Sequence, residues 1–301
     1  MGQVATTAAI YLLSKLKMHQ VGEFTARELF ELESVEVQGG LLHAARLPRS
    51  RLFLASNAEA ERDIVVFLGE AQPPTGKLAL CQRLVEQGRM LGVRRFFTFS
   101  AMATDMAPTK PSRIFGVASD AYGLADLNRH HVSVLAEGTI SGLNGVALAA
   151  AAEAGVPSTG LLGEMPGIAT QIPYPTASAA VLRVFKDLAG LPLDLNELED
   201  YGRSMQSQLA QIYERVREVF GQEAGEEAAA VAAPEEKPAP ARERPQAKTL
   251  TELEQQRIET LFDEARGDRS KAFELKKELD RLGVFAKYED RFLDLFEPPK
   301  V

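Results

Sequence analysis

Residues 137–164 read EGTISGLNGVALAAAAEAGVPSTGLLGE, a stretch in which glycine turns flank a helical pattern. A helix is expected over residues 144–154, where six alanines give a high helix propensity and a thin helix that packs close to a sheet. A buried strand is expected directly afterwards, over residues 156–162. The stretch therefore predicts a helix followed by a strand, which is the repeating unit of α/β proteins.

Short apolar runs and helical periods alternate in the chain before this stretch. Residues 64–68 read IVVFL and are apolar at every position, as expected for a parallel strand that is covered on both faces. A helix is expected over residues 77–91 and a further strand over residues 95–100. This alternation predicts an α/β fold in three layers, α/β/α, with a mostly parallel sheet.

The composition of the chain changes after residue 220. Residues 1–220 are expected to form the α/β domain. Residues 221–247 are rich in Ala, Glu and Pro and almost lack large apolar side chains, so we expect a disordered linker there. Residues 248–301 carry two amphipathic helical patterns and a final aromatic-rich segment, which predicts a helical tail. Docking of this tail on its own body is the favoured interpretation, and docking on a partner or a sister subunit is the alternative.

Composition argues against several classes of function. The net charge of -8 is unlike that of a general nucleic-acid binder, which usually presents a basic face. The single cysteine, Cys81, rules out an intramolecular disulfide framework and a cysteine-based zinc site, and it suits the reducing cytoplasm. No apolar run reaches the ~18 residues that a membrane-spanning helix needs. We therefore expect a cytoplasmic protein with no nucleic-acid or membrane partner.

Ligands in parallel α/β sheets bind beyond the carboxyl ends of the strands, so the loops at that edge hold the candidate site. One such loop precedes the alanine-rich helix and places backbone N–H groups at a helix N-terminus, where an anion can bind. Its candidate residues are Ser141, Gly142, Asn144 and Gly145. The alternative, which we favour, is that the glycines only permit a tight connection into the helix.

Carboxylates and hydroxyls at other strand ends provide further candidates. Glu70 and Glu164 each follow a strand and are expected to face one crevice, where two carboxylates perform acid–base chemistry or bind a cation. A role as loop-capping acceptors is the favoured alternative. Ser100 and Ser141 are candidate nucleophiles, although no obvious histidine and acid accompany them in the sequence.

Signatures of common catalytic sites are absent from the sequence. It contains no phosphate-binding loop, no dinucleotide-binding glycine pattern, no zinc-protease motif and no serine-hydrolase motif. The adjacent histidines His130 and His131 point apart in an extended strand, which argues against a shared metal site. We therefore assign no catalytic residue, no metal site and no cofactor, and favour a protein that is not an enzyme.

Four motifs occur in order along the body of the chain. They are DIVVFLGEAQP at 63–73, RRFFTFSA at 94–101, GTISGLNGVALAAAAEAGVPSTGLLGEMPG at 138–167 and IPYPTASAAVLRVF at 172–185. Together they resemble the PAC2 family, which contains proteasome assembly chaperone 2 and many bacterial and archaeal proteins, some labelled ATP-grasp superfamily. The resemblance implies a fold akin to purine nucleoside phosphorylases and homo-oligomers, with trimers common among the bacterial members. It brings no established catalytic residue.

Both ends of the chain depart from the family pattern. Family members usually begin with a strand and a Gly-Trp-Pro-Gly-like turn, of which Met1-Gly2 is the remnant here. Either the start codon is misassigned, or the first strand is absent and the sheet lacks one strand. Some proteasome chaperones end in a hydrophobic-Tyr-any tripeptide, whereas this chain ends in Pro299-Lys300-Val301, which argues against direct docking of its end on the proteasome ring.

Two hypotheses of function follow. The first, which we favour, is a non-enzymatic oligomeric scaffold or assembly-chaperone-like protein. The resemblance favours a trimer, and residues 248–301 would serve as an interaction arm for a protein partner. The second is an enzyme or sensor that binds a small anionic ligand, of nucleoside, phosphate or carboxylate type. Its crevice would be formed by residues 141–145, Glu70 and Glu164.

Overall fold

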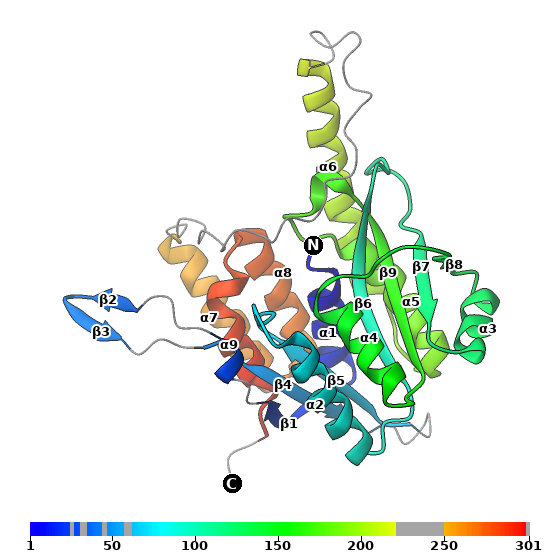
Figure 1. Ribbon diagram of the computed structural model, residues 1–301. Coiled ribbons are helices and arrows are strands. Elements are labelled where there is room, and N and C mark those ends of the chain that lie inside the picture. The colour runs from blue at the N-terminus through cyan, green and yellow to red at the C-terminus, as the bar shows by residue number, and fades with distance from the viewer. Residues whose placement is uncertain (25–26, 31–34, 44–46, 57–61, 221–249, 299–301) are drawn as a thin grey trace.

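The computed structural model describes residues 1–24, 27–30, 35–43, 47–56, 62–220 and 250–298, and its elements are labelled in Figure 1. The strands are β1 (His19–Phe24), β2 (Glu36–Gln38), β3 (Leu41–His43), β4 (Ser50–Ala55), β5 (Ile64–Gly69), β6 (Phe96–Thr104), β7 (Ile114–Ala118), β8 (Ser133–Val134) and β9 (Ser158–Pro166). The α-helices are α1 (Val4–Lys15), α2 (Lys77–Met90), α3 (Ala121–Arg129), α4 (Gly142–Glu153), α5 (Pro175–Ala189), α6 (Asn196–Phe220), α7 (Glu252–Gly267), α8 (Ala272–Leu282) and α9 (Phe285–Leu293).

One sheet has four strands in the order β6-β9-β7-β8. β6 pairs with β9 in parallel along its whole length, from Phe96 opposite Ser158 to Thr104 opposite Pro166. β7 is parallel to β8 and antiparallel to β9. The connection from β6 to β7, residues 105–113, contains no helix and is shorter than a parallel crossover needs, so the chain returns in the opposite direction.

The second sheet has three strands in the order β1-β4-β5, and both of its pairs are antiparallel. β4 faces β5 from Ser50 opposite Gly69 to Ala55 opposite Ile64. The predicted α/β class is confirmed, and two of the three strand pairs of the four-stranded sheet are parallel. The antiparallel three-stranded sheet is an addition to that prediction.

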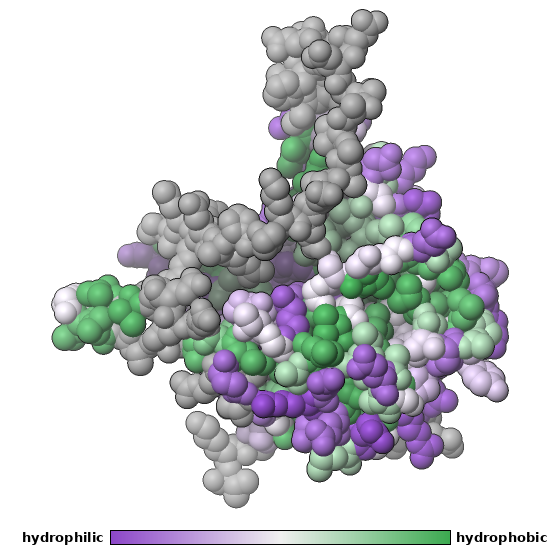
Figure 2. Space-filling model, viewed as in Figure 1, coloured by the Kyte–Doolittle hydropathy of each residue, from purple (hydrophilic) through white to green (hydrophobic). Residues whose placement is uncertain are grey.

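β2 and β3 form a hairpin that projects from the body (Figures 1 and 2). Gly39 and Gly40 make its turn with φ values of 58° and 82°, which glycine adopts without strain. Val37, Leu41 and Leu42 of this hairpin are 60%, 70% and 73% exposed. The hairpin therefore presents apolar side chains to solvent, as the green surface of Figure 2 shows.

Two layers of helices cover the four-stranded sheet (Figure 1). α1 and α5 pack against each other on one face, and α2 and α4 pack against each other on the other face. Neighbouring residues of β6 reach both layers, because successive side chains of a strand point to opposite faces. Phe97 packs against the core that contains α1 and α5, and Phe96 packs against the core of α2 and α4. The predicted three layers are thus present.

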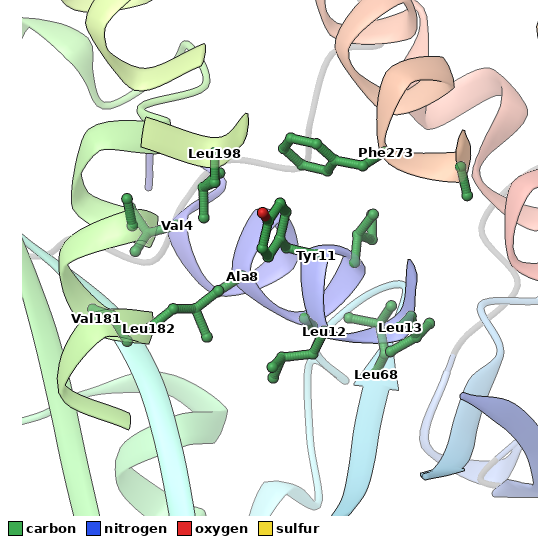
Figure 3. Packing of buried hydrophobic residues seen from close by; sticks show 14 of the residues in the cluster. Val4, Ala8, Tyr11, Leu12, Leu13, Leu68, Val181, Leu182, Leu198 and Phe273 are labelled. Atoms are coloured by element: carbon green, nitrogen blue, oxygen red, sulfur yellow. The ribbon is translucent and has the colours of Figure 1, made fainter. Parts of the chain in front are cut away.

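Helix α1 lies between the body and the C-terminal helices, as Figure 3 shows for Tyr11 and its neighbours. Every side chain from Ala8 to Ser14 is buried. The Tyr11 ring meets the ring of Phe273 in α8, and its hydroxyl donates to the Asp194 carbonyl oxygen at 2.8 Å. A helix enclosed on several sides needs no polar stripe, which explains the apolar character of this segment.

The C-terminal helices pack against the body of the same chain. α7 begins with a capping box, in which Thr251 Oγ1 accepts from the Glu254 N–H and the Glu254 carboxylate accepts from the Thr251 N–H. Phe296, just after α9, meets Phe53 of β4 with ring centroids 6.1 Å apart. The tail therefore contacts both α1 and the three-stranded sheet. The predicted linker, residues 221–247, lies outside the described residues.

Candidate functional site: the cleft between the sheets

A cleft of about 3880 Å³ lies between the two sheets. β5 is the outer strand of the three-stranded sheet and β6 is the outer strand of the four-stranded sheet, and both strands line the cleft. Residues of α1, α2, α4 and α5 also line the cleft, and so do Asp280 of α8 and Phe285 of α9. The cleft is therefore bordered by two strand edges and by helices of both layers.

Five of the residues singled out in the sequence line this cleft. They are Glu70, Ser100, Ser141, Gly142 and Asn144. Gly145 and Glu164 are not part of the lining. The structure thus gathers the turn before α4 and the ends of β5 and β6 at one place, and it separates Glu164 from them.

The amino end of α4 borders the cleft and is capped in part by the chain itself. Gln72 Oε1 accepts a hydrogen bond of 3.0 Å from the Leu143 N–H. Gly142 has a φ of 75°, in the left-handed region that favours glycine, and a Cβ there would lie 3.1 Å from Gln72 Oε1. A Cβ on Gly145 would lie 1.9 Å from the Ile140 carbonyl oxygen. The tight turn therefore accounts for both glycines, and an anion would have to share this helix end with Gln72.

Asn144 joins α4 to β6. Its Nδ2 donates to the Phe99 carbonyl oxygen at 2.7 Å and to Ser100 Oγ at 3.1 Å. These contacts hold the first turn of the helix against the strand. The Ser100 hydroxyl accepts a hydrogen bond from the Asn144 amide. A nucleophilic serine needs a base that removes its hydroxyl proton, and an amide N–H cannot act as that base.

Glu164 lies inside β9 and is 1% exposed. Arg113 binds both carboxylate oxygens, with Nε 2.7 Å from Oε2 and Nη2 2.5 Å from Oε1, and Thr104 Oγ1 donates to Oε1 at 2.9 Å. Hydrogen bonding by Arg113 holds the pKa of the Glu164 carboxyl below its ordinary value of 4.5. The structure places Glu164 within β9, which continues to Pro166, and its carboxylate binds Arg113.

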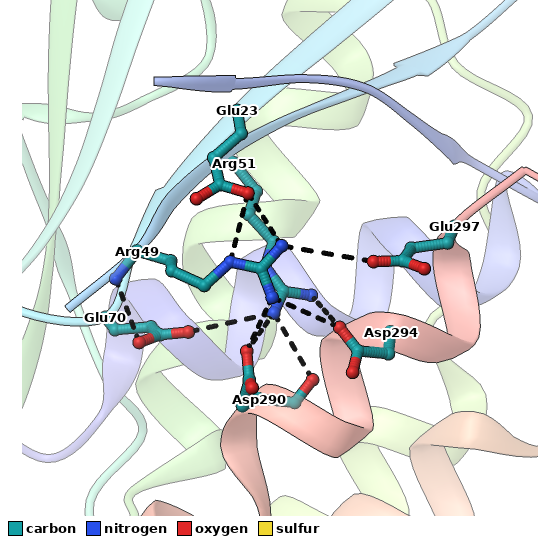
Figure 4. A network of polar contacts seen from close by, with 7 residues as sticks. All are labelled: Glu23, Arg49, Arg51, Glu70, Asp290, Asp294 and Glu297. Carbon is teal, nitrogen blue, oxygen red and sulfur yellow. Dashed lines mark hydrogen bonds and ion pairs between the residues drawn. The ribbon is translucent and has the colours of Figure 1, made fainter. Parts of the chain in front are cut away.

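Glu70 belongs to a network of charges that joins the body to the C-terminal helices (Figure 4). Its Oε2 accepts from the Arg49 backbone N–H at 3.0 Å, and its Oε1 lies 3.9 Å from Arg51 Nη2. The Arg51 side chain is fully buried and forms ion pairs with Asp290 of α9 and, at 3.0 Å, with Asp294. These contacts give Glu70 a structural role at the joint between body and tail.

The sequence analysis missed this joint. Arg49 and Arg51 are two residues apart in extended backbone, a spacing that directs both side chains to one face. Asp290 and Asp294 are four residues apart, which is the spacing of one helical face. Arg49 adds ion pairs with Glu23 at 2.6 Å and with Asp290 at 3.0 Å. These two spacings are visible in the sequence. The pairing of the arginines with the aspartates is not, because it joins distant parts of the chain.

Among the described residues, neither Cys81 nor a cluster of metal-binding side chains provides a further site. Cys81 is buried with its Sγ 3.7 Å from the Leu143 carbonyl oxygen, and burial raises the pKa of its thiol to about 11. Within the described ranges, no group of three His, Cys, Asp or Glu side chains is placed to hold a metal ion. The helices of that same part of the chain include none that is long and apolar enough to cross a membrane.

Comparisons with known proteins relate this chain to one family. The model described as "PAC2 family" matches residues 1–213. A PAC2 family protein from Streptomyces avermitilis is 26% identical with a TM-score of 0.60, and the match covers 70% of this chain and 89% of that one. A comparison with curated proteins found no match.

Two further solved structures share the fold at lower identity. A proteasome-assembly chaperone homologue from Mycobacterium tuberculosis is 20% identical with a TM-score of 0.61, covering 70% of this chain and 89% of that one. PbaB from Pyrococcus furiosus, an archaeal proteasome activator, is 21% identical with a TM-score of 0.58, covering 71% and 89%. At these identities the likeness concerns the fold.

Proposed function

This chain belongs to the PAC2 family, and we propose that it acts by binding another protein, as an assembly-chaperone-like scaffold and not as an enzyme. The match over residues 1–213 confirms the resemblance seen in the sequence. One structure of the same fold is a proteasome-assembly chaperone homologue and another is a proteasome activator. These relatives support a protein partner, and the transfer of that role to this chain is our proposal.

The contacts of the candidate polar groups carry this proposal. Glu164 is held by Arg113, and the Asn144 amide is held between the Phe99 carbonyl oxygen and Ser100. A general acid or base must reach the proton that it transfers, and these contacts give the candidate groups structural partners instead. Beside its polar groups, the cleft presents apolar side chains and two strand edges, which are features that recognise polypeptide.

Two outer surfaces support a role in protein association. Val37, Leu41 and Leu42 make the β2–β3 hairpin apolar and exposed, and such surfaces usually mark interaction sites. The C-terminal helices pack on their own body and leave charged faces outward, which we propose as the surface for a protein partner. We further propose a cytoplasmic homo-oligomer, with a trimer as the form that the family resemblance favours.

The second candidate function is an enzyme or sensor for a small anionic ligand. It is favoured by one observation, namely that Ser141 and Gly142 bring the amino end of α4 to the wall of the cleft. The N–H groups at a helix N-terminus bind anions readily. The hydrogen bond from the Leu143 N–H to Gln72 leaves fewer N–H groups at this helix end for an anion, so we rank this function second.

Native mass spectrometry of the full-length protein separates the two functions. We expect an oligomer of bare subunits that forms a complex when unassembled proteasome subunits from the same organism are added. Those subunits are the first clients to test, because one solved structure of this fold is a proteasome-assembly chaperone homologue and another is a proteasome activator. A stoichiometric small-molecule adduct together with no client complex would favour the second function, and the mass of the adduct would identify its chemical class.

A further inference from the structure

The β2–β3 hairpin gathers four exposed large apolar side chains within a short stretch. They are Val35, Val37, Leu41 and Leu42, which are between 53% and 73% exposed. The other exposed large apolar residues of the described chain are spread over separate elements, such as α2, α3, α6 and α7. Figure 2 shows the hairpin as a green surface that stands away from the body. This concentration of apolar surface therefore needs an explanation of its own.

The register of the hairpin places two of these side chains on one face. Val37 is the partner of Leu42 across the two strands. Directly opposite residues of an antiparallel pair have their side chains on the same face of the sheet. Residues 35–38 read VEVQ, in which apolar and polar residues alternate as they do in a strand with one packed face and one solvated face. The pattern therefore indicates a hairpin with one face that packs against other apolar side chains.

The described part of the same chain does not cover this face. Among the described elements, β2 and β3 make extensive contact only with each other, and Figure 1 shows them projecting from the body. Each strand has three residues. An isolated two-stranded hairpin is at best marginally stable in water. The apolar face therefore needs a cover that the described residues do not supply.

A second copy of this chain is the cover that these observations favour. The hairpin needs its cover whenever the protein is folded, and a client that binds and leaves would expose the face each time. A second copy is present whenever the protein is. The residues outside the described ranges are a poor alternative, because the longest of these stretches, 221–249, has one large apolar residue, Val231.

The surface of the second copy that matches this face is the same face. In a two-fold symmetric contact one patch meets itself, so the hairpin needs no separate acceptor site. The apolar residues elsewhere on the described chain are too scattered to provide one. We propose that the apolar face of β2–β3, which includes Val37 and Leu42, packs against the same face of a second copy around a two-fold axis. This contact deepens the proposed homo-oligomer and rests on that part of the proposed function.

Native mass spectrometry of the full-length protein and of its double variant Val37→Glu/Leu42→Glu tests the contact. A two-fold contact joins copies in pairs, so we expect the double variant to have half as many subunits as the unmodified protein at the same concentration. The introduced carboxylates would repel each other across the axis and would lose their hydration there. Leu253→Glu/Met90→Glu is the matched control and should keep the number of subunits, because these residues are 78% and 75% exposed and lie on α7 and α2.

Cross-linking of Leu42→Cys shows which surfaces meet, and this variant adds no charge to the hairpin. Cys81, the sole cysteine of the chain, is buried, and its thiol has a pKa of about 11, so it reacts poorly at neutral pH. Two packed sheets lie about 10 Å apart, so a bismaleimide of that span should join two copies of Leu42→Cys into a covalent dimer. The unmodified protein and Leu253→Cys should give no covalent dimer.

Three outcomes would overturn this proposal. One is an unchanged number of subunits in the glutamate double variant, since the hairpin face would then be no part of the contact between copies. Another is a lower number of subunits without a covalent dimer of Leu42→Cys, which would show that the hairpin meets a different surface of the second copy. The third is loss of a client complex at a constant number of subunits, which would assign the hairpin to the client.

The hairpin contact and the scaffold function fail in different ways. A halved number of subunits and a covalent dimer of Leu42→Cys, with no complex of proteasome subunits, would support the contact and count against the scaffold function. A client complex that the unmodified protein and the glutamate double variant form equally, with the same number of subunits in both, would refute the contact and leave the scaffold function standing.

Discussion

The ring of Phe273 in α8 packs edge-on against the ring of Tyr11 in α1, with the two centroids 4.8 Å apart. Both side chains are buried, and Phe273 also lies 6.1 Å from the ring of Tyr201 in α6. One aromatic side chain of the tail therefore contacts the first helix of the body and a long helix near its end. The burial of α1 depends on both parts of the chain.

Replacing Phe273 by alanine should lower the free energy of unfolding by about 3–5 kcal/mol, since it leaves a cavity beside Tyr11 and Tyr201. Urea unfolding followed by circular dichroism measures this loss. Leu253→Ala is the matched control in the same tail, because Leu253 is 78% exposed and should change stability by less than about 0.5 kcal/mol. Equal effects of the two substitutions would contradict the docking of α8 on α1.

Arg51→Met should destabilise the protein by about 3–5 kcal/mol, because it leaves Glu70, Asp290 and Asp294 close together without their buried cation. Adding Asp290→Asn and Asp294→Asn to this variant should restore part of the loss, since it removes the remaining repulsion. Urea midpoints of the three proteins test this. No recovery in the triple variant would show that Arg51 acts through packing alone.

The exposed pair Arg83–Glu28 provides the control for this charge substitution. Its two side chains are 55% and 54% exposed and 2.6 Å apart. Solvent screens such pairs, so Arg83→Met should cost less than about 1 kcal/mol. A cost as large as that of Arg51→Met would show that burial is not what distinguishes the two arginines.

The Glu164–Arg113 pair should make stability depend on pH in the acid range. The pKa of Glu164 is held below 4.5 in the folded protein, so its carboxylate contributes stability above the unfolded pKa and loses that contribution as the pH falls through the folded pKa. Glu164→Gln should therefore lower the free energy of unfolding at pH 7. The difference in this free energy between the variant and the unmodified protein should shrink below about pH 4. Urea unfolding at several pH values measures this. A constant difference across that range would argue against the ion pair, and Glu153→Gln on the exposed face of α4 is the control.

Gly145→Ala should destabilise the protein by at least about 2 kcal/mol, because the added Cβ would lie 1.9 Å from the Ile140 carbonyl oxygen and force the turn to move. Gly267→Ala, at the end of α7, is the control, since a Cβ there meets nothing within 4 Å. Alanine should be neutral or stabilising at that position by up to about 1 kcal/mol. Thermal unfolding of the two variants checks the prediction, and a stable Gly145→Ala protein would contradict the turn geometry.

The elements themselves were largely predictable, and their extents less so. The expected helix at residues 77–91 is α2, and the apolar run 64–68 lies in β5. The strand expected over residues 156–162 instead runs from Ser158 to Pro166. Pairing with β6 holds the backbone extended beyond the apolar run, so Glu164 lies inside the strand and not in a loop. A pairing partner on another strand is invisible to local periodicity.

The place of the candidate site was predictable, but the partners of its side chains were not. The turn before α4 and the ends of β5 and β6 do border one cleft, as the rule for strand ends suggests. The partners of the side chains were not predictable: Arg113 for Glu164, Gln72 for the Leu143 N–H, and Asp290 of α9 for Arg51. Each partner is placed by a different element, so its proximity follows from packing.

The sequence by itself determined the α/β class, the order of most helices and strands and the membership of the PAC2 family, because these depend on the spacing of apolar residues and on motifs that neighbouring residues compose. Only the tertiary structure decided that the strands form two sheets with facing open edges, that β7 runs against β9, and that the tail is joined to the body through Arg51 and Phe273. These features are contacts between residues far apart in the chain. Their free energy depends on which surfaces meet, and no local pattern records that choice.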